Sequence, residues 1–114
     1  MHELSIVLSI VDIAQQQAEK AGATAIEEIE IDIGCLSTVE MNAFDFAWQQ
    51  GIKQTPLEHT VRIINRIKGK AKCLDCEAIF PLEHLYDACP VCGEHLVDIV
   101  EGKELRVKSL VVSL

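Results

Sequence analysis

Two pairs of cysteines carry the clearest chemistry in this 114-residue chain. Cys73 and Cys76 form one C-x-x-C motif, and Cys89 and Cys92 form a second one after twelve intervening residues. Each motif places two sulfurs on one side of a tight turn, and the connecting segment folds back so that four thiolates can surround one ion at about 2.3 Å. The spacing therefore predicts a tetrahedral metal site.

The ligand set leaves more than one ion open. Zinc is the usual ion of a four-thiolate site, whereas iron in a rubredoxin-like site uses the same ligands. Two disulfides would need an oxidising compartment, but no basic segment precedes the first apolar residues, and Glu3 and Asp12 interrupt them, unlike a secretory signal. We therefore expect structural Zn(II) in a cytoplasmic protein.

The beginning of the chain, Met1-His2-Glu3, offers a second set of metal-ligating atoms. The amine of Met1, the amide and imidazole nitrogens of His2 and the amide of Glu3 can surround one ion in a plane. Deprotonated amides and imidazole suit Ni(II) or Cu(II), and a helix that begins here leaves its first N–H groups without helical partners. The simpler interpretation is an exposed histidine, with Glu3 complementing the helix dipole.

A helix and a strand are predicted to follow this segment. Apolar residues at helical spacing over residues 4–20 indicate a helix buried on most of its circumference, with Gly22 in the left-handed conformation at its end. Ile29, Ile31 and Ile33 alternate with acidic residues, which predicts a half-buried strand that stops at Gly34.

A second helix and a basic strand are expected next. Ser37-Thr38-Val39-Glu40 matches a capping box, which would start a helix at Ser37 and leave Gly51 beyond its end. From Val61 to Lys72 the alternation predicts a strand with a basic face. We expect that face to be solvated and to pair with the acidic face of the first strand.

Residues 96–100 and 105–111 alternate again after the cysteines. If the last strand joins the earlier sheet, the metal module is an insertion between strands. The expected fold is therefore α+β, with two helices packed on a small, mostly antiparallel sheet and an inserted four-cysteine zinc ribbon. The expected domains are residues 1–69, completed by a C-terminal strand at 104–114, and a zinc ribbon at 70–98.

Charge and hydropathy argue against two classes of binding partner, nucleic acids and membranes. Ten Lys and Arg against 18 Asp and Glu give a net charge of −8, which repels phosphate backbones. No apolar run is long enough to span a membrane. We expect neither nucleic acid nor a membrane as partner.

The residues taken together resemble the HypA/HybF family of nickel-insertion proteins, which act in maturation of nickel-iron hydrogenases. The resemblance covers essentially the whole chain, although it does not separate the HypA branch from the HybF branch. Besides both C-x-x-C motifs, it is carried by Met1-His2-Glu3-Leu4-Ser5, Ile31-Asp32-Ile33-Gly34, Leu36-Ser37-Thr38-Val39-Glu40 and Leu105-Arg106-Val107-Lys108-Ser109.

This resemblance implies a nickel metallochaperone rather than an enzyme. It implies that His2 is the main Ni(II) ligand, assisted by the amine of Met1 and the backbone of Glu3, and that Glu40 can complete the coordination shell. It implies structural Zn(II) on Cys73, Cys76, Cys89 and Cys92. The implied partners are a HypB-type GTPase and the hydrogenase large-subunit precursor, and a homodimer is left open.

Two alternatives remain at this stage. A rubredoxin-like electron carrier would use the same cysteines for iron, although Glu77 stands where such a knuckle favours glycine. A zinc-ribbon adaptor for nucleic acid would depend on the basic run from Arg62 to Lys72.

Cys35 has no partner in the sequence and is expected to be a small, buried or half-buried thiol.

Overall fold

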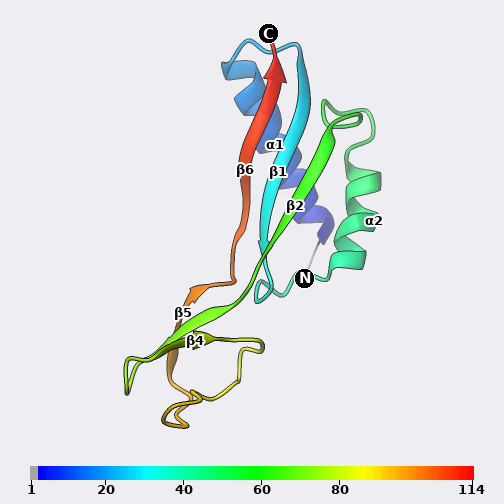
Figure 1. Ribbon diagram of the computed structural model, residues 1–114. Coiled ribbons are helices and arrows are strands. Elements are labelled where there is room, and N and C mark those ends of the chain that lie inside the picture. The colour runs from blue at the N-terminus through cyan, green and yellow to red at the C-terminus, as the bar shows by residue number, and fades with distance from the viewer. Residues whose placement is uncertain (1–2) are drawn as a thin grey trace. The chain divides into compact units, whose positions relative to one another are not determined.

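The computed structural model describes residues 3–114 and contains two helices and six strands among them (Figure 1). In chain order these are α1 (Glu3–Lys20), β1 (Ala25–Gly34), α2 (Met41–Gly51), β2 (Val61–Ile67), β3 (Lys70–Cys73), β4 (Ile79–Pro81), β5 (Val97–Glu101) and β6 (Leu105–Ser113). The strands form two three-stranded sheets, ordered β2-β1-β6 and β4-β3-β5.

The chain divides into two compact units. Unit 1 contains residues 1–31, 39–65 and 106–114, and unit 2 contains residues 32–38 and 66–105. Unit 1 holds both helices, whereas unit 2 holds all four cysteines of the C-x-x-C motifs. The predicted domain limits at 69/70 and 98 stay a prediction.

The α1 helix ends as the sequence predicts. Gly22 has φ +67°, its N–H donates to the carbonyl of Glu19, and the N–H of Ala23 donates to the carbonyl of Ala18. These two bonds are those of a Schellman motif, which favours glycine because an L side chain is strained at that φ.

The expectation that α1 is buried on most of its circumference is wrong. Its buried residues form one stripe (Ile6, Val7, Ile10, Val11, Ala14 and Ala18), whereas Leu4, Leu8 and Ile13 are about half exposed. The stripe packs partly against α2, where Gly51 permits close approach: a Cβ there would lie 2.7 Å from a methyl carbon of Val7.

The α2 helix begins later than predicted. Its N-cap is Glu40, whose carboxylate accepts hydrogen bonds from the N–H groups of Asn42 and Ala43. Ser37 does not cap the helix, because its hydroxyl donates to the carbonyl of Gly34 and the next residue, Thr38, has φ +65°, which is outside the helical region. Gly51 is the last helical residue rather than a residue beyond the end.

The prediction that the final strand joins the first sheet is confirmed, because β6 pairs with β1. The outer surface of this sheet carries a polar cluster around Glu30. The carboxylate of Glu30 accepts from Asn65 at 2.7 Å and from Ser109 at 3.3 Å, and Lys108 lies 3.4 Å from it. The basic partner of the acidic strand is therefore on β6.

The expected basic face of β2 is not solvated throughout. Arg62 turns toward α2, where its Nη2 lies 2.9 Å from the carboxylate of Asp45, and its guanidinium stacks over the rings of Phe44 and Trp48. The apolar residue beside it, Val61, is 59% exposed instead. An aromatic surface and a carboxylate on α2 attract the guanidinium more strongly than water does.

The single strand predicted from Val61 to Lys72 is also wrong, since β2 and β3 belong to different sheets. The break lies at Gly69. A Cβ at Gly69 would lie 2.1 Å from the carbonyl oxygen of Leu82, so only glycine permits this backbone contact in unit 2.

Unit 2 has a small core of its own. It consists of Leu36, Ala71, Cys73, Phe80, Leu82 and Cys89, with Ala78, Val97 and Ile99 packed against it. The β3 strand pairs antiparallel with β4 and β5 and so joins the two halves of the cysteine module.

The predicted α+β fold class, two helices with small antiparallel sheets and a zinc-ribbon-like module, is confirmed. No helix within residues 3–114 is long and apolar enough to cross a membrane.

Candidate metal centres

The two C-x-x-C motifs form the same local structure twice. In the first, the N–H of Glu77 donates to the carbonyl of Cys73, and the N–H of Cys73 donates to the carbonyl of Ala78. The second motif repeats both bonds at identical spacing, from Gly93 to Cys89 and from Cys89 to Glu94. The sequence repeat therefore encodes two equivalent knuckles.

Each knuckle places its fifth residue at positive φ. Gly93 has φ +80° and Glu77 has φ +65°. Glycine adopts this conformation freely, whereas glutamate is strained there. From the sequence, Glu77 counted only against a rubredoxin-like iron site, and the strained conformation was not predicted.

The knuckles bring all four thiols to one point. The Sγ atoms of Cys73 and Cys92 lie 3.5 Å apart, those of Cys76 and Cys89 lie 3.7 Å apart, and all four lie within 4.8 Å of one another. A tetrahedron with metal–sulfur bonds of about 2.3 Å has edges of about 3.8 Å. The sulfurs are too far apart for disulfides, whose bonds are about 2.05 Å, and they suit a four-thiolate metal site.

The thiols of the cluster differ in how readily they lose a proton. Hydrogen bonds from the backbone N–H groups of Cys92 and Val91 outweigh desolvation and lower the pKa of the Cys89 thiol to about 7. For Cys92 the backbone N–H of Glu94 favours the thiolate, but desolvation and the neighbouring sulfurs raise the pKa to about 12. Four thiolates therefore coexist only when a cation balances them.

The donor set fits zinc as a structural ion. Cys73 and Cys89 are buried in the core of unit 2, whereas Cys76 and Cys92 are exposed. Four thiolates fill a tetrahedral shell and leave no position for a substrate or water. When bound, zinc would supply cross-linking of the two knuckles rather than catalysis.

A different arrangement occurs where the two helices of unit 1 begin. The N–H of Glu40 lies 3.3 Å from the carboxylate of Glu3, which is the first residue of α1. Glu40 is also the N-cap of α2, with its own carboxylate 2.6 Å from the N–H of Ala43. Each of the two helices therefore has a carboxylate at its start, where the helix dipole favours negative charge, and the Glu3 carboxylate also reaches the backbone of Glu40.

The predicted nickel ligands are only partly described. Met1 and His2 lie outside the described residues, whereas Glu3 and Glu40 are in direct contact. Sequence reasoning assigned only the backbone of Glu3 to the site and missed the role of its side chain. The sequence does show an acidic residue at the start of each helix. Many helices begin in this way, so the pattern does not predict that the two residues contact each other.

The fifth cysteine and the histidines of the described residues do not belong to either group. Cys35 is exposed, so the expectation of a buried or half-buried thiol is wrong. His84 lies beside the carboxylate of Asp87 at 3.5 Å, and His59 lies 3.7 Å from Glu58. No histidine among residues 3–114 joins the cysteine cluster.

Comparison with known proteins gives three consistent results. A family profile described as hydrogenase/urease nickel incorporation, metallochaperone, hypA matches residues 1–112. The hydrogenase maturation factor HypA of Parabacteroides distasonis is 49% identical over 98% of this chain and 97% of its own length. The protein of the same name from Geotalea uraniireducens is 39% identical over 98% of this chain and 99% of its own length.

The fold has similar solved structures. The solution structure of the Ni metallochaperone HypA from Helicobacter pylori superimposes with a TM-score of 0.72 at 28% sequence identity. That comparison covers 99% of this chain and 98% of the other.

Proposed function

This chain belongs to the HypA family of nickel-incorporation metallochaperones, and we propose that it binds Ni(II) at its N-terminus and delivers it to the large-subunit precursor of nickel-iron hydrogenase. The observation that carries the site is the contact between Glu3 and Glu40. It holds the side chain of the first helical residue against the backbone N–H of Glu40, the residue whose carboxylate the family resemblance assigns to nickel.

The reach of the chain supports this ligand set. Met1 and His2 precede Glu3 directly, and each residue spans at most about 3.6 Å. The amine of Met1, the imidazole of His2, the amide of Glu3 and the Glu40 carboxylate can therefore converge on one ion. Ni(II) prefers amide and imidazole nitrogens arranged in a plane, whereas zinc prefers a tetrahedral arrangement of ligands.

The location of the site suits a carrier. Amides in the first turn of a helix have no intrahelical partner, so recruiting one breaks no helical hydrogen bond. Binding must displace protons from nitrogen, so the affinity is sensitive to pH and to competing ligands. Such a peripheral site can release its ion, whereas the closed thiolate site retains zinc.

We further propose that the partners are a HypB-type GTPase and the hydrogenase precursor, and that the protein acts in the cytoplasm without enzymatic turnover. The net charge of −8 is compatible with handling of cations and with docking to basic surfaces.

The test is a calorimetric nickel titration of the untagged, zinc-loaded protein. We expect a single site in the wild type and a loss of affinity of at least about tenfold in His2→Ala, which corresponds to about 1.4 kcal/mol of binding free energy. Blocking the amine of Met1 with an acetyl group should have the same effect, because it removes a ligand and leaves the fold intact.

His59→Ala is the matched control, since His59 is a histidine with a side chain 94% exposed and lies outside the proposed site. Its nickel affinity should equal that of the wild type, and zinc content should stay constant in every variant. Equal nickel affinity with a free and with a blocked amine would refute the N-terminal site.

A further inference from the structure

The β6 strand forms an open edge of the sheet in unit 1. It pairs with β1 on one side and has no further strand beside it among the described residues. It is nine residues long and contains no proline, and Val111 is 46% exposed. An edge strand directs every second N–H and C=O away from its sheet, and natural proteins normally shorten or cover such edges or place charged residues on them, which here are Arg106 and Lys108.

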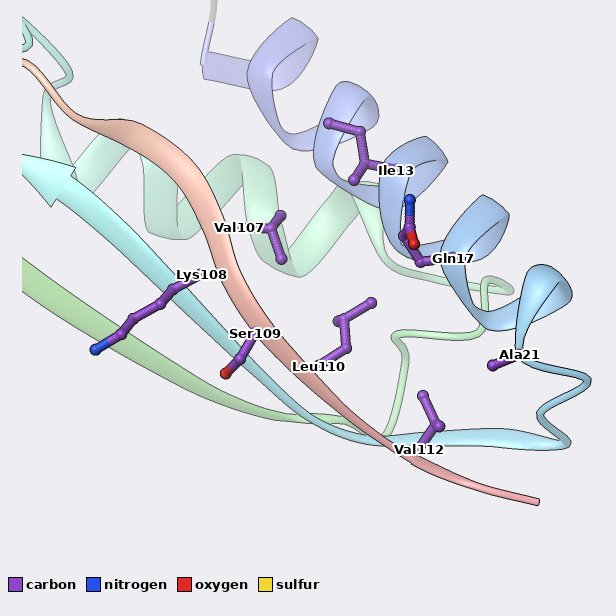
Figure 2. A pocket seen from close by; sticks show the side chains of 8 residues that line it. All are labelled: Ile13, Gln17, Ala21, Val107, Lys108, Ser109, Leu110 and Val112. Carbon is purple, nitrogen blue, oxygen red and sulfur yellow. The ribbon is translucent and has the colours of Figure 1, made fainter.

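A groove runs along this edge between β6 and α1 (Figure 2). Its volume is about 430 Å³, and its main lining residues are Ile13, Gln17, Ala21, Val107, Leu110 and Val112. Figure 2 shows Leu110 and Val112 directed toward α1. Ile13 is 47% exposed on the facing side of α1, so the groove has an apolar floor that the protein itself leaves uncovered.

The opposite face of β6 is basic. Lys108 points away from α1 in Figure 2, whereas Leu110 and Val112 point toward it, so the regular alternation of β6 is interrupted between Lys108 and Leu110. Before that interruption, Arg106 lies two residues from Lys108 and shares its face of the strand. Both are exposed, and β6 contains no carboxylate. Lys108 remains 55% exposed although it pairs with Glu30.

We propose that the edge of β6 is a docking site for an extended segment of a partner protein that adds a fourth strand to this sheet. An added strand lies about 4.8 Å from its neighbour, and its side chains alternate between the two faces. The residues of the added strand that enter the groove must be apolar. The residues between them would lie beside Arg106 and Lys108, so the matching segment alternates apolar with acidic residues.

A second copy of this chain fits the edge less well than such a segment. Two β6 strands paired across a two-fold axis place Arg106 and Lys108 of both copies on the same face of one sheet.

The probe is a dye-labelled synthetic peptide of about nine residues, the length of β6, in which valine and glutamate alternate. It is titrated into the full-length, zinc-loaded, nickel-free protein and followed by fluorescence anisotropy and amide NMR. We expect saturable binding with shifts concentrated in β6 and α1. A peptide with lysine in place of glutamate, and one N-methylated on its backbone amides, should each bind at least about tenfold more weakly.

Ile13→Glu places a charge in the groove and should weaken binding of the valine-glutamate peptide by at least about tenfold. Leu8→Glu is the matched control, because Leu8 lies on the same helix at 51% exposure, against 47% for Ile13, and does not line the groove. We expect that control to bind like the wild type.

Three outcomes would overturn the proposal: no binding up to about 1 mM peptide, equal binding of the N-methylated peptide, or equal losses in the two variants. Concentration-dependent dimerisation with NMR shifts in β6 would also overturn it, because the occupant would then be a second copy. Since nickel is absent throughout, these results do not depend on the proposed nickel site.

Discussion

At the residue scale, the two knuckles differ mainly in how well their fifth residue suits a positive φ. Glu77 and Gly93 occupy equivalent places, with the same hydrogen bond back to the first cysteine of the motif. A glutamate at φ +65° costs about 1–2 kcal/mol of folding free energy relative to the right-handed region. Glycine has no such strain, and its only cost is the larger conformational entropy that it loses on folding.

Glu77→Gly should therefore raise the free energy of unfolding of the zinc-loaded protein by about 0.5–1 kcal/mol. Gly93→Ala should lower it by about 1–2 kcal/mol through backbone strain alone, since no atom lies within 4 Å of the added Cβ. Chemical denaturation at fixed free zinc measures both changes. Glu77→Ala is the control and should change little, because alanine keeps the strain.

Glu40 has two tasks that substitutions can separate. It caps α2 through two hydrogen bonds, and the proposed function assigns it to nickel. Serine is a better N-cap than glutamate but carries no carboxylate, whereas alanine performs neither task.

We expect Glu40→Ser to keep the stability of the nickel-free protein within about 0.5 kcal/mol of the wild type, and Glu40→Ala to lower it by about 1 kcal/mol. If Glu40 is a ligand, both variants should bind nickel more weakly to a similar extent. Thermal unfolding and nickel calorimetry of the same samples decide the question. Full nickel affinity in Glu40→Ser would reduce Glu40 to a capping residue.

At the scale of elements, the Glu30 cluster connects all three strands of the first sheet. Hydrogen bonding from Asn65 is the main cause that lowers the pKa of Glu30, and the charge of Lys108 and the hydroxyl of Ser109 add to it. A carboxyl group with a lowered folded-state pKa stabilises the fold above its unfolded-state pKa. That contribution disappears as the pH falls through the folded-state pKa.

Glu30→Gln should therefore be less stable than the wild type at pH 7, and the difference should shrink as the pH falls below about 4.5, the ordinary pKa of glutamate. Urea unfolding of both proteins across this range, followed by the fluorescence of Trp48, gives the difference directly. Loss of zinc in acid affects both proteins equally and cancels. A difference that stays constant with pH would show that the charge of Glu30 contributes nothing.

The sequence predicted these elements better than it predicted their ends and faces. Alternating isoleucines suffice to define β1, and the repeated C-x-x-C motif suffices to assemble the thiols, because each depends on local spacing. The start of α2 was misplaced because Ser37 and Glu40 satisfy a capping pattern, whereas the positive φ of Thr38 decides where the helix begins.

The failures share a cause in tertiary contacts. Arg62 faces α2 because Asp45 and two aromatic rings lie there, which no periodicity of β2 reveals. The break between β2 and β3 depends on the approach of Gly69 to the backbone of Leu82, thirteen residues away. The contact of Glu3 with Glu40 likewise joins residues 37 positions apart.

At the scale of the whole molecule, the two units differ in what stabilises them. Unit 1 contains both helices, and its buried side chains include Phe44, Trp48, Ile29 and Ile31. Unit 2 has strands of only four, three and five residues, and two of the six residues in its core are the cysteines Cys73 and Cys89. A core this small usually needs a metal to remain folded.

Removal of zinc should therefore unfold unit 2 while unit 1 keeps its structure. The chain provides a reporter for each unit, since its only tryptophan, Trp48, lies in unit 1 and its only tyrosine, Tyr86, lies in unit 2. We expect a strong chelator to leave the fluorescence of Trp48 and the helical circular dichroism nearly unchanged. Amide exchange in β3 and β5 should become fast, and re-addition of zinc should restore protection. Simultaneous loss of the Trp48 signal would show that the thiolate site stabilises the helices as well, and that the two units fold as one.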